Sequence, residues 1–167
     1  MMFEIEDKDF SKINTYDFRK QIILYQKKNP CCIFYPTLKC THAKHQSDSL
    51  LHKKFKVFEK SLYRCLKKKN INVNITHLWA FITYKNEMID SIWHSHYIEN
   101  YKEQLTALMY LDSNGIGTEF ENGHIIKPEI NKWYVWDSRL NHKPMDNKSN
   151  KTRIVISTGL QVLDKSS

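Results

Sequence analysis

The 167-residue sequence has no long hydrophobic run and no repeated or low-complexity segment. No window approaches the roughly 18 consecutive apolar residues of a membrane-spanning helix. The N-terminus is acidic and polar rather than a basic patch followed by an apolar stretch, which argues against a signal peptide. We therefore expect a soluble, cytoplasmic protein with no membrane partner.

Cysteine is also scarce, with four residues, all within the first 65 positions and none in a CxxC pair. A chain of this length does not need disulfides to fold, so reduced thiols are expected. Cys40, His42 and His45 are residue types that bind zinc, but the cluster lacks a convincing second half. We interpret this segment as a polar loop.

The chain has no length to spare for a second ordinary domain, although 41% hydrophobic residues suffice for one good core. We expect a single domain over residues 1–167. Its first part, residues 1–70, is predicted to be a helical N-terminal layer, and residues 71–163 are predicted to form the β core.

The net charge of +8 is compatible with an anionic partner. Much of the excess is lysine distributed along the chain, including Lys67, Lys68 and Lys69 at an expected helix end, where cations suit the helix dipole. Nucleic acid is therefore a possible but not a favoured partner.

Two helices are predicted in the first 70 residues. One spans residues 16–28, with Phe18, Ile22 and Tyr25 at helical spacing, and Asn29-Pro30 stops it. The other spans about residues 49–69. Its apolar face, which is expected to pack in the core, consists of Leu51, Phe55, Phe58, Leu62 and Leu66.

After Asn70 the pattern changes to short runs rich in aromatic and β-branched residues, which is typical of strands. These runs cover residues 75–84, 92–96, 104–111, 133–136 and 153–158. Asn114-Gly115 and Asn122-Gly123 are turn signals between them. The spacing favours a sandwich, barrel or jelly roll over a parallel α/β sheet.

His94-Ser95-His96 lies on one of these expected strands, so the two imidazoles project to the same face and are close enough to chelate one ion. Taken alone, the pair is more typical of two ordinary strand histidines than of a metal site. Downstream, His142 follows the run at 133–136, and Arg153 opens the last β run.

In this order the motifs resemble the phage-type and prolyl-hydroxylase-like 2-oxoglutarate/Fe(II) oxygenases, over about 80 residues. Those enzymes have a His-x-carboxylate pair, a Tyr-Leu strand, a Gly-Thr-x-Phe turn, a distal His and then an Arg. The corresponding residues here are His94-Ser95-His96, Met109-Tyr110-Leu111, Gly117-Thr118-Glu119-Phe120, His142 and Arg153. The resemblance implies a double-stranded β-helix, or jelly roll, of the α+β, mainly β class, with the helices packed on one sheet.

The resemblance also implies a non-haem iron dioxygenase that uses Fe(II), 2-oxoglutarate and O2 and releases succinate and CO2. Iron would be held by His94, His142 and the residue at position 96, with positions left open for cosubstrate and O2. Arg153 would grip the far carboxylate of 2-oxoglutarate with its forked guanidinium. Hydroxyl groups complete that grip in the family, and by offset they correspond to Tyr84, Tyr110 and Ser157.

The sequence departs from the family pattern at position 96, where the expected carboxylate is replaced by His96. Three neutral imidazoles leave the site one negative charge short, which should alter its metal preference and O2 reactivity. A three-histidine oxygenase and an inactive site are both compatible with this change. Glu99 or Glu119 is a candidate replacement ligand, whereas Asp137 is interpreted as a turn residue.

Two other classes remain open. A cupin-type metalloprotein also has a His-x-His pair and a later histidine on such a barrel, but it needs no 2-oxoglutarate and leaves Arg153 without a task. A non-catalytic basic β-sandwich would instead expose an aromatic platform for stacking, formed by Trp79, Trp93, Trp133 and Trp136. The strand positions of these tryptophans favour the core for most of them.

The sequence does not identify the prime substrate. A protein side chain, a free amino acid and a nucleobase all remain possible, because specificity in this fold lies in loops such as residues 97–103 and 146–151. The richness in Lys, Asn and Ile indicates an AT-biased genome, and the resemblance favours a phage or bacterial source.

Overall fold

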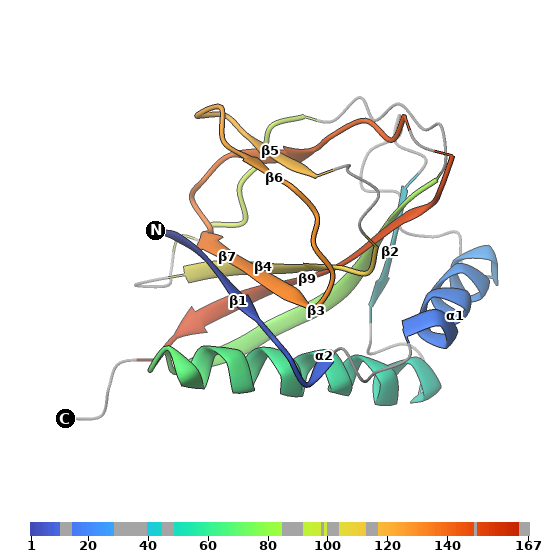
Figure 1. Cartoon of the computed structure of the whole chain (residues 1–167), viewed down its shortest axis with the longest axis horizontal. Coiled ribbons are helices and arrows are strands. Elements are labelled where there is room, and N and C mark those ends of the chain that lie inside the picture. Colours follow the sequence, from blue (N-terminus) through green and yellow to red (C-terminus); the bar gives the residue numbers. More distant parts are fainter. Residues whose placement is uncertain are drawn as a thin grey trace.

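The protein is described by a computed structural model in which two antiparallel sheets face each other and two helices cover the larger sheet (Figure 1). The described residues are 1–10, 15–28, 40–44, 49–84, 92–97, 99, 104–112, 117–148 and 150–163. Among them, neither helix is both long enough and apolar enough to cross a bilayer.

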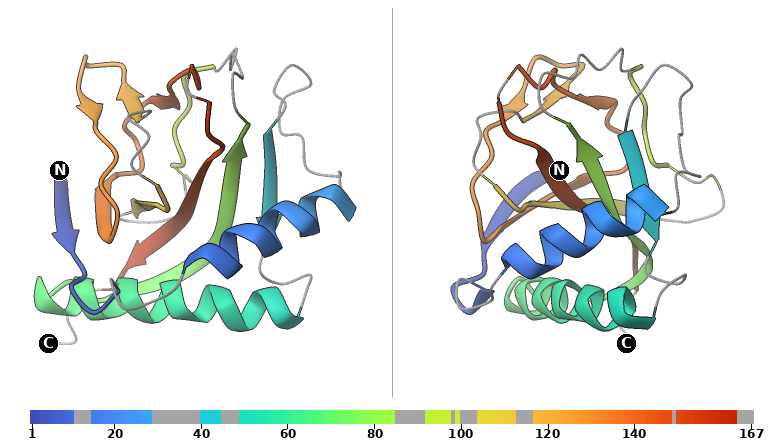
Figure 2. Two further views of the ribbon diagram at one scale, coloured as in Figure 1. Left: turned by 45° about the vertical axis from the view of Figure 1, so that its right-hand side comes forward. Right: turned by 90° about the vertical axis from the view of Figure 1, so that its right-hand side faces the viewer.

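Both predicted helices are confirmed, as α1 (Thr15–Lys28) and α2 (Ser49–Lys68). They lie on the same side of the larger sheet (Figure 2). Phe18 of α1 packs against Phe55 and Phe58 of α2, with ring centroids 5.2 and 4.6 Å apart. Asn70 has a positive φ of 57°, the left-handed conformation that commonly ends a helix.

The larger sheet has six strands in the order β1-β7-β4-β9-β3-β2, and every neighbouring pair is antiparallel. The strands are β1 (Met2–Glu6), β2 (Cys40–Lys44), β3 (Val73–Thr83), β4 (Gln104–Tyr110), β7 (Lys132–Asp137) and β9 (Arg153–Val162). The predicted runs at 75–84, 104–111, 133–136 and 153–158 are therefore confirmed as strands.

The smaller sheet has three short strands in the order β6-β5-β8, namely β5 (Thr118–Phe120), β6 (Ile125–Ile126) and β8 (His142–Pro144). The predicted turn at Asn122-Gly123 joins β5 to β6. There Gly123 has a φ of 83° and donates its N–H to the carbonyl of Phe120 at 2.9 Å.

Strand alternation divides the buried residues into two cores. Ile154, Ile156 and Leu160 of β9 face the helices and share a core with Leu62 and Leu66 of α2. The opposite face of the larger sheet packs against the smaller sheet in a second core, formed by Leu108, Tyr110, Phe120, Ile126, Tyr134, Trp136 and Val155. The predicted jelly-roll architecture is confirmed, and the space between the two sheets belongs to this second core.

The prediction that residues 1–70 form a purely helical layer is wrong. β1 and β2 also belong to this part of the chain, and they form the two edges of the larger sheet. Cys40 and His42 lie on β2 rather than in a loop, and His45 lies outside the described residues. Of the cysteines, Cys65 is free and buried, as expected for a thiol. Cys31 and Cys32 lie outside the described residues.

The buried carboxylate of Asp7, directly after β1, forms hydrogen bonds with α2. The carboxylate of Asp7, fully shielded from solvent, accepts hydrogen bonds from Ser61 and, at 2.5 Å, from Arg64. The indole N–H of Trp133 on β7 donates to the Ser61 hydroxyl at 3.0 Å. Burial alone would raise the pKa of Asp7, but these hydrogen bonds and the charge of Arg64 outweigh it and lower that pKa.

Candidate functional site

Three histidines converge in the space between the two sheets. One ring nitrogen from each of His94, His96 and His142 lies within 4.8 Å of the others. Their ring centroids are 4.6 Å apart for His94 and His142, 4.9 Å for His96 and His142, and 5.2 Å for His94 and His96. His142, which lies 46 positions after His96 in the sequence, thus joins His94 and His96 in one cluster, the histidine cluster.

Backbone hydrogen bonds hold the segment that carries His94 and His96. His94 pairs with His142 of β8 in an isolated antiparallel bridge, and His96 donates its N–H to the carbonyl of Ser138 at 2.9 Å. The prediction of a full strand at residues 92–96 is therefore wrong. The segment is extended, and a single bridge is its only strand pairing among the described residues, yet the alternation still turns both imidazoles inward.

Two of the three rings have the orientation that metal ligands require. The Nδ1 atom of His94 lies 3.1 Å from the carbonyl of Ile92, and that of His142 lies 2.9 Å from the carbonyl of Leu140. With the proton on Nδ1 donated to a carbonyl, the lone pair of Nε2 is available for a cation. This arrangement fixes the tautomer and orientation of metal-binding histidines in proteins.

The surroundings of His142 keep its ring neutral. It is 5% exposed and packs against Trp136 and Phe120, with ring centroids 5.1 and 5.7 Å away. Burial lowers the pKa of His142 to about 4, against a small opposing effect from its hydrogen bond to Leu140. At neutral pH the ring is therefore in the uncharged form that coordinates metal ions.

A buried guanidinium lies on the same inner face of the larger sheet. Arg153, 1% exposed, is the first residue of β9 and donates to the carbonyl of Gly117 at 3.4 Å. Its guanidinium carbon lies 5.3 Å from the ring centre of Tyr110. Gly117 must be glycine because a Cβ there would lie 1.7 Å from the carbonyl oxygen of Ile126.

β5 links Arg153 to the histidine cluster. Thr118 lies within 2.7 Å of the Tyr110 hydroxyl, and Phe120, two residues further along the same face, contacts His142. Two residues of a strand span about 7 Å. Arg153 thus contacts Gly117, directly before β5, and His142 pairs with Phe120 at the other end of this short strand.

Of the three predicted hydroxyl residues, two lie on this inner face. Tyr110 belongs to the second core, and burial raises its pKa, so the hydroxyl stays protonated. Ser157 is 4% exposed and lies four residues after Arg153 on β9, so both side chains project to one face. Tyr84 packs instead against the core beneath the helices and is not brought to this group.

Thr83 takes the place predicted for Tyr84. It pairs directly with Arg153 between β3 and β9, so the two side chains stand next to each other on one face. Its hydroxyl is fully buried and has no hydrogen-bond partner in the described structure. The sequence signal that identifies it is the alternation of β3, in which Leu78, Ala80 and Ile82 face the helices.

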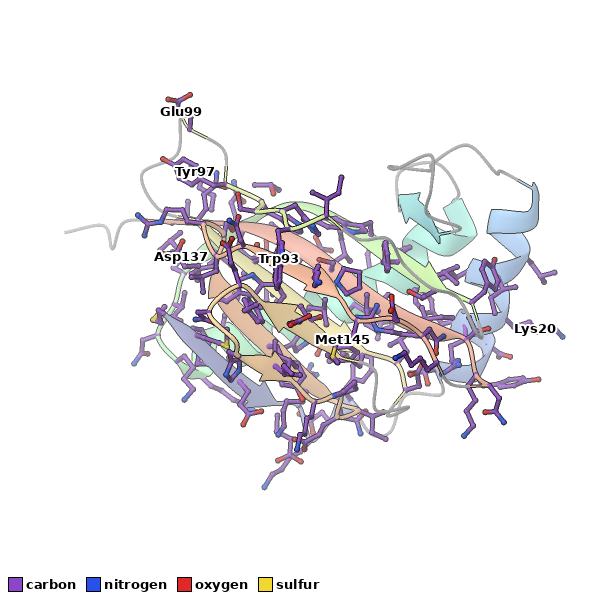
Figure 3. The ribbon with its side chains drawn as sticks, turned by 90° about the horizontal axis from the view of Figure 1, so that it is seen from above. Lys20, Trp93, Tyr97, Glu99, Asp137 and Met145 are labelled. Atoms are coloured by element: carbon purple, nitrogen blue, oxygen red, sulfur yellow. The ribbon has the colours of Figure 1, made fainter. Side chains whose placement is uncertain are left out.

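No carboxylate among the described residues joins the histidine cluster. Glu119 faces outward on β5, where its carboxylate lies 3.7 Å from the Lys143 ammonium. Asp137 is the last residue of β7, directly before a turn, and accepts three hydrogen bonds from Arg139, which lower its pKa to about 2. Glu99 is exposed and points away from the body of the molecule (Figure 3).

The tryptophans do not form one exposed stacking platform. Trp133 and Trp136 are fully buried in the two cores, and Trp79 and Trp93 are half-buried. The ammonium of Lys143 lies 4.5 Å from the centre of the Trp93 ring, on the outer face of the smaller sheet. The core interpretation is confirmed for Trp133 and Trp136.

The donor set therefore fits a divalent transition metal together with an anionic chelator. Imidazoles suit iron, nickel, zinc and copper, and three of them leave coordination positions for further ligands. The guanidinium supplies two parallel N–H groups that match a carboxylate.

No protein-family model matches the chain. No curated protein matches it either. Several solved structures are similar to this chain. The carbocyclase SnoK from nogalamycin biosynthesis, a non-haem α-ketoglutarate-dependent enzyme, aligns with a TM-score of 0.72 at 10% identity, over 96% of this chain and 79% of SnoK.

Two further structures have similar coverage. The viral collagen prolyl hydroxylase of Paramecium bursaria Chlorella virus-1 has a TM-score of 0.60 at 13% identity, over 97% of this chain and 96% of that enzyme. HygX from Streptomyces hygroscopicus, solved with nickel and 2-oxoglutarate bound, has a TM-score of 0.59 at 10% identity, over 96% and 82% of the two chains. The resemblance is confirmed in the fold: the chain has the double-stranded β-helix of the 2-oxoglutarate/Fe(II)-dependent oxygenases.

Proposed function

We propose that this protein is a non-haem iron dioxygenase that uses 2-oxoglutarate and O2 to hydroxylate a substrate, with release of succinate and CO2. The observation that carries the proposal is that buried Arg153 and a cluster of three histidines lie at the two ends of β5: Arg153 donates to Gly117 and His142 pairs with Phe120. A metal site alone would not need a guanidinium at this depth, whereas a dicarboxylate cosubstrate does.

Each residue has a defined task in this proposal. His94, His96 and His142 hold the metal, and the carbonyls of Ile92 and Leu140 keep two of those rings oriented. Bound iron would couple oxidative decarboxylation of 2-oxoglutarate by O2 to hydroxylation of a C–H bond, with one oxygen atom entering each product.

The cosubstrate end of the site is assigned to the inner face of β3, β4 and β9. Arg153 binds the far carboxylate in a bidentate manner. The hydroxyls of Thr83, Tyr110 and Ser157 lie on the same face and would donate to the remaining carboxylate lone pairs. The second core around Trp136 and Phe120 excludes water from the metal, which strengthens these charged contacts.

His96 makes the proposed metal site unusual. Three neutral imidazoles leave a divalent ion with its full charge, whereas a carboxylate at this position would cancel one unit of it. We expect the ion to bind anionic ligands, including 2-oxoglutarate, more strongly than in a site with two histidines and one carboxylate.

The same feature supports a second candidate, a three-histidine metalloenzyme that does not use 2-oxoglutarate. The two candidates differ in the task of Arg153. In the second candidate the guanidinium has no ligand to bind, and its replacement would leave the metal-dependent reaction unaffected.

The deciding experiment measures succinate formed from 2-oxoglutarate by purified protein loaded anaerobically with Fe(II) and then exposed to O2. Wild type is expected to form succinate slowly even without the prime substrate. His96→Asp restores the carboxylate and is expected to retain or increase this reaction. His124→Asp is the matched control, since His124 is exposed on the β5–β6 turn. Succinate from neither wild type nor His96→Asp would contradict the proposal.

A further inference from the structure

Almost the entire net charge of the protein lies in one helix. Residues 49–69 contain eight Lys or Arg and one Glu, a net charge of +7, while the whole chain has a net charge of +8. The remaining 146 residues are therefore nearly neutral. The charge is concentrated on one element, rather than distributed along the chain as the sequence interpretation held.

The described lysines of α2 form a stripe along its outer face. Lys56, Lys60 and Lys67 are exposed and share one helical face, and exposed Lys68, in the last turn, and Lys69, just after it, add charge at the C-terminal end. We call these five residues the basic stripe. At 1.5 Å per residue the row is about 20 Å long. The stripe therefore presents positive charge along most of the length of α2.

The protein itself does not neutralise the stripe. None of its five lysines forms an ion pair with a described residue. Glu59 is the one carboxylate on α2 itself, and Asp7 and Asp9 are matched by Arg64 at 2.5 and 3.6 Å. Like charges four residues apart, such as Lys56 and Lys60, destabilise a helix by a few tenths of a kcal/mol. The helix dipole favours the lysines at the C-terminal end, but folding alone gives no reason for Lys56 and Lys60 in the middle of the stripe.

We propose that the basic stripe binds the phosphate backbone of a nucleic acid. An extended row of ammonium groups complements a line of phosphates, and each contact releases condensed counterions. A peripheral membrane helix would instead insert an apolar face into the lipid. In α2 the apolar face, including Phe58, Leu62 and Leu66, is already buried against the sheet, and Tyr63 is the only large apolar side chain described on the outer face.

The stripe is far from the histidine cluster. α2 runs beneath the larger sheet, whereas the smaller sheet with β5 and β6 lies on the other side of it (Figure 1). A nucleic acid on the stripe would hold the protein in place without entering the space between the sheets. The inference thus does not depend on the proposed oxygenase activity.

The test is fluorescence anisotropy of a short labelled duplex DNA of mixed sequence, titrated with the full chain at several salt concentrations. Contacts from five lysines predict that affinity falls about 10²- to 10³-fold between about 50 and 200 mM salt. The salt slope is the slope of the logarithm of the binding constant against the logarithm of the salt concentration. The variant Lys56→Gln/Lys60→Gln/Lys67→Gln should reduce its magnitude by about 2.7, because each lost contact contributes about 0.9.

The matched control is Lys20→Gln/Lys127→Gln/Lys148→Gln, which removes the same charge from exposed sites on other elements; Lys20 is visible on α1 in Figure 3. This control should retain nearly all of the slope. Equal losses in the two variants would show a response to net charge alone and would overturn the proposal. So would absence of duplex binding by wild type at low salt, or binding to phosphatidylserine vesicles but not to DNA.

Discussion

His94 and His142 face each other across a single antiparallel bridge and exchange both backbone hydrogen bonds, at 3.1 and 2.9 Å. The pairing sets the distance between two proposed metal ligands through the backbone rather than through the side chains. Their rings, 4.6 Å apart, are then oriented by carbonyls two residues upstream of each histidine. The proposed metal site is therefore preorganised by main-chain contacts.

Removing one histidine of the cluster should weaken metal binding strongly. We expect His142→Ala to lower Ni(II) affinity by at least about 100-fold, since loss of even an outer partner of a metal ligand costs 10- to 100-fold. Isothermal titration calorimetry with Ni(II) measures this. His124→Ala, at an exposed position outside the cluster, should bind as wild type. Equal affinities for the two variants would exclude the cluster as the metal site.

Bound metal should stabilise the fold. A ligand that binds only the native state adds about 2.7 kcal/mol at a concentration 100 times its Kd. For a domain of this size the expected rise in melting temperature is about 5–10 °C. Differential scanning fluorimetry with Ni(II), followed by excess chelator, should show the rise and its reversal. A rise of the same size in His142→Ala would mean that the metal acts elsewhere.

Arg153→Lys should separate cosubstrate binding from metal binding. The ammonium keeps the charge but loses the fork that matches a carboxylate. We expect 2-oxoglutarate affinity to fall about 10- to 100-fold, the loss of a charge-assisted hydrogen bond of 1.5–3 kcal/mol, with Ni(II) affinity unchanged. Arg139→Lys, at an exposed turn, is the control and should change neither affinity.

The buried carboxylate of Asp7 should contribute measurably to stability at neutral pH. Asp7→Asn removes the charge from hydrogen bonds with Ser61 and Arg64, so we expect a loss of about 1.5–3 kcal/mol in the free energy of unfolding. Urea denaturation at pH 7 measures it. Asp9→Asn is the control: this carboxylate is 61% exposed and 3.6 Å from Arg64, and its loss should cost less than about 1 kcal/mol.

The Asp7 contribution should disappear in acid. Its pKa is below 3.8 in the folded protein, so the stabilisation is fully present above the unfolded-state pKa and is lost as pH falls through the folded-state pKa. The difference in unfolding free energy between wild type and Asp7→Asn should therefore shrink below about pH 4. A difference that stays constant from pH 7 to acid would contradict the assigned ion pair.

The sequence predicted the elements that have a strong local signal. α2 has an apolar face at helical spacing, and β4, β7 and β9 are rich in apolar and aromatic residues that are buried in one core or the other. β1 and β2 were missed because both are short edge strands, one with a distant pairing partner and the other with a polar sequence of its own. β1 pairs with β7, some 130 residues away, and β2 reads Cys-Thr-His-Ala-Lys.

The site was predictable only where residue type and order carried information. The order of His94, His142 and Arg153 indicated one constellation, and the structure brings the three histidines together. Thr83 was missed because choosing between it and Tyr84 depends on the exact strand register, and one residue of shift changes the face. The outward position of Glu119 was equally hard to predict, because β5 has only three residues and is defined by its pairing with β8 rather than by a local sequence pattern.

The most direct test of the central claim is isothermal titration calorimetry of 2-oxoglutarate into the protein with and without bound Ni(II). If the imidazoles and Arg153 bind the two ends of one cosubstrate, binding should be strong in the nickel-loaded protein and at least 10-fold weaker without metal. Binding that is absent in both forms, or equal in both, would contradict the account.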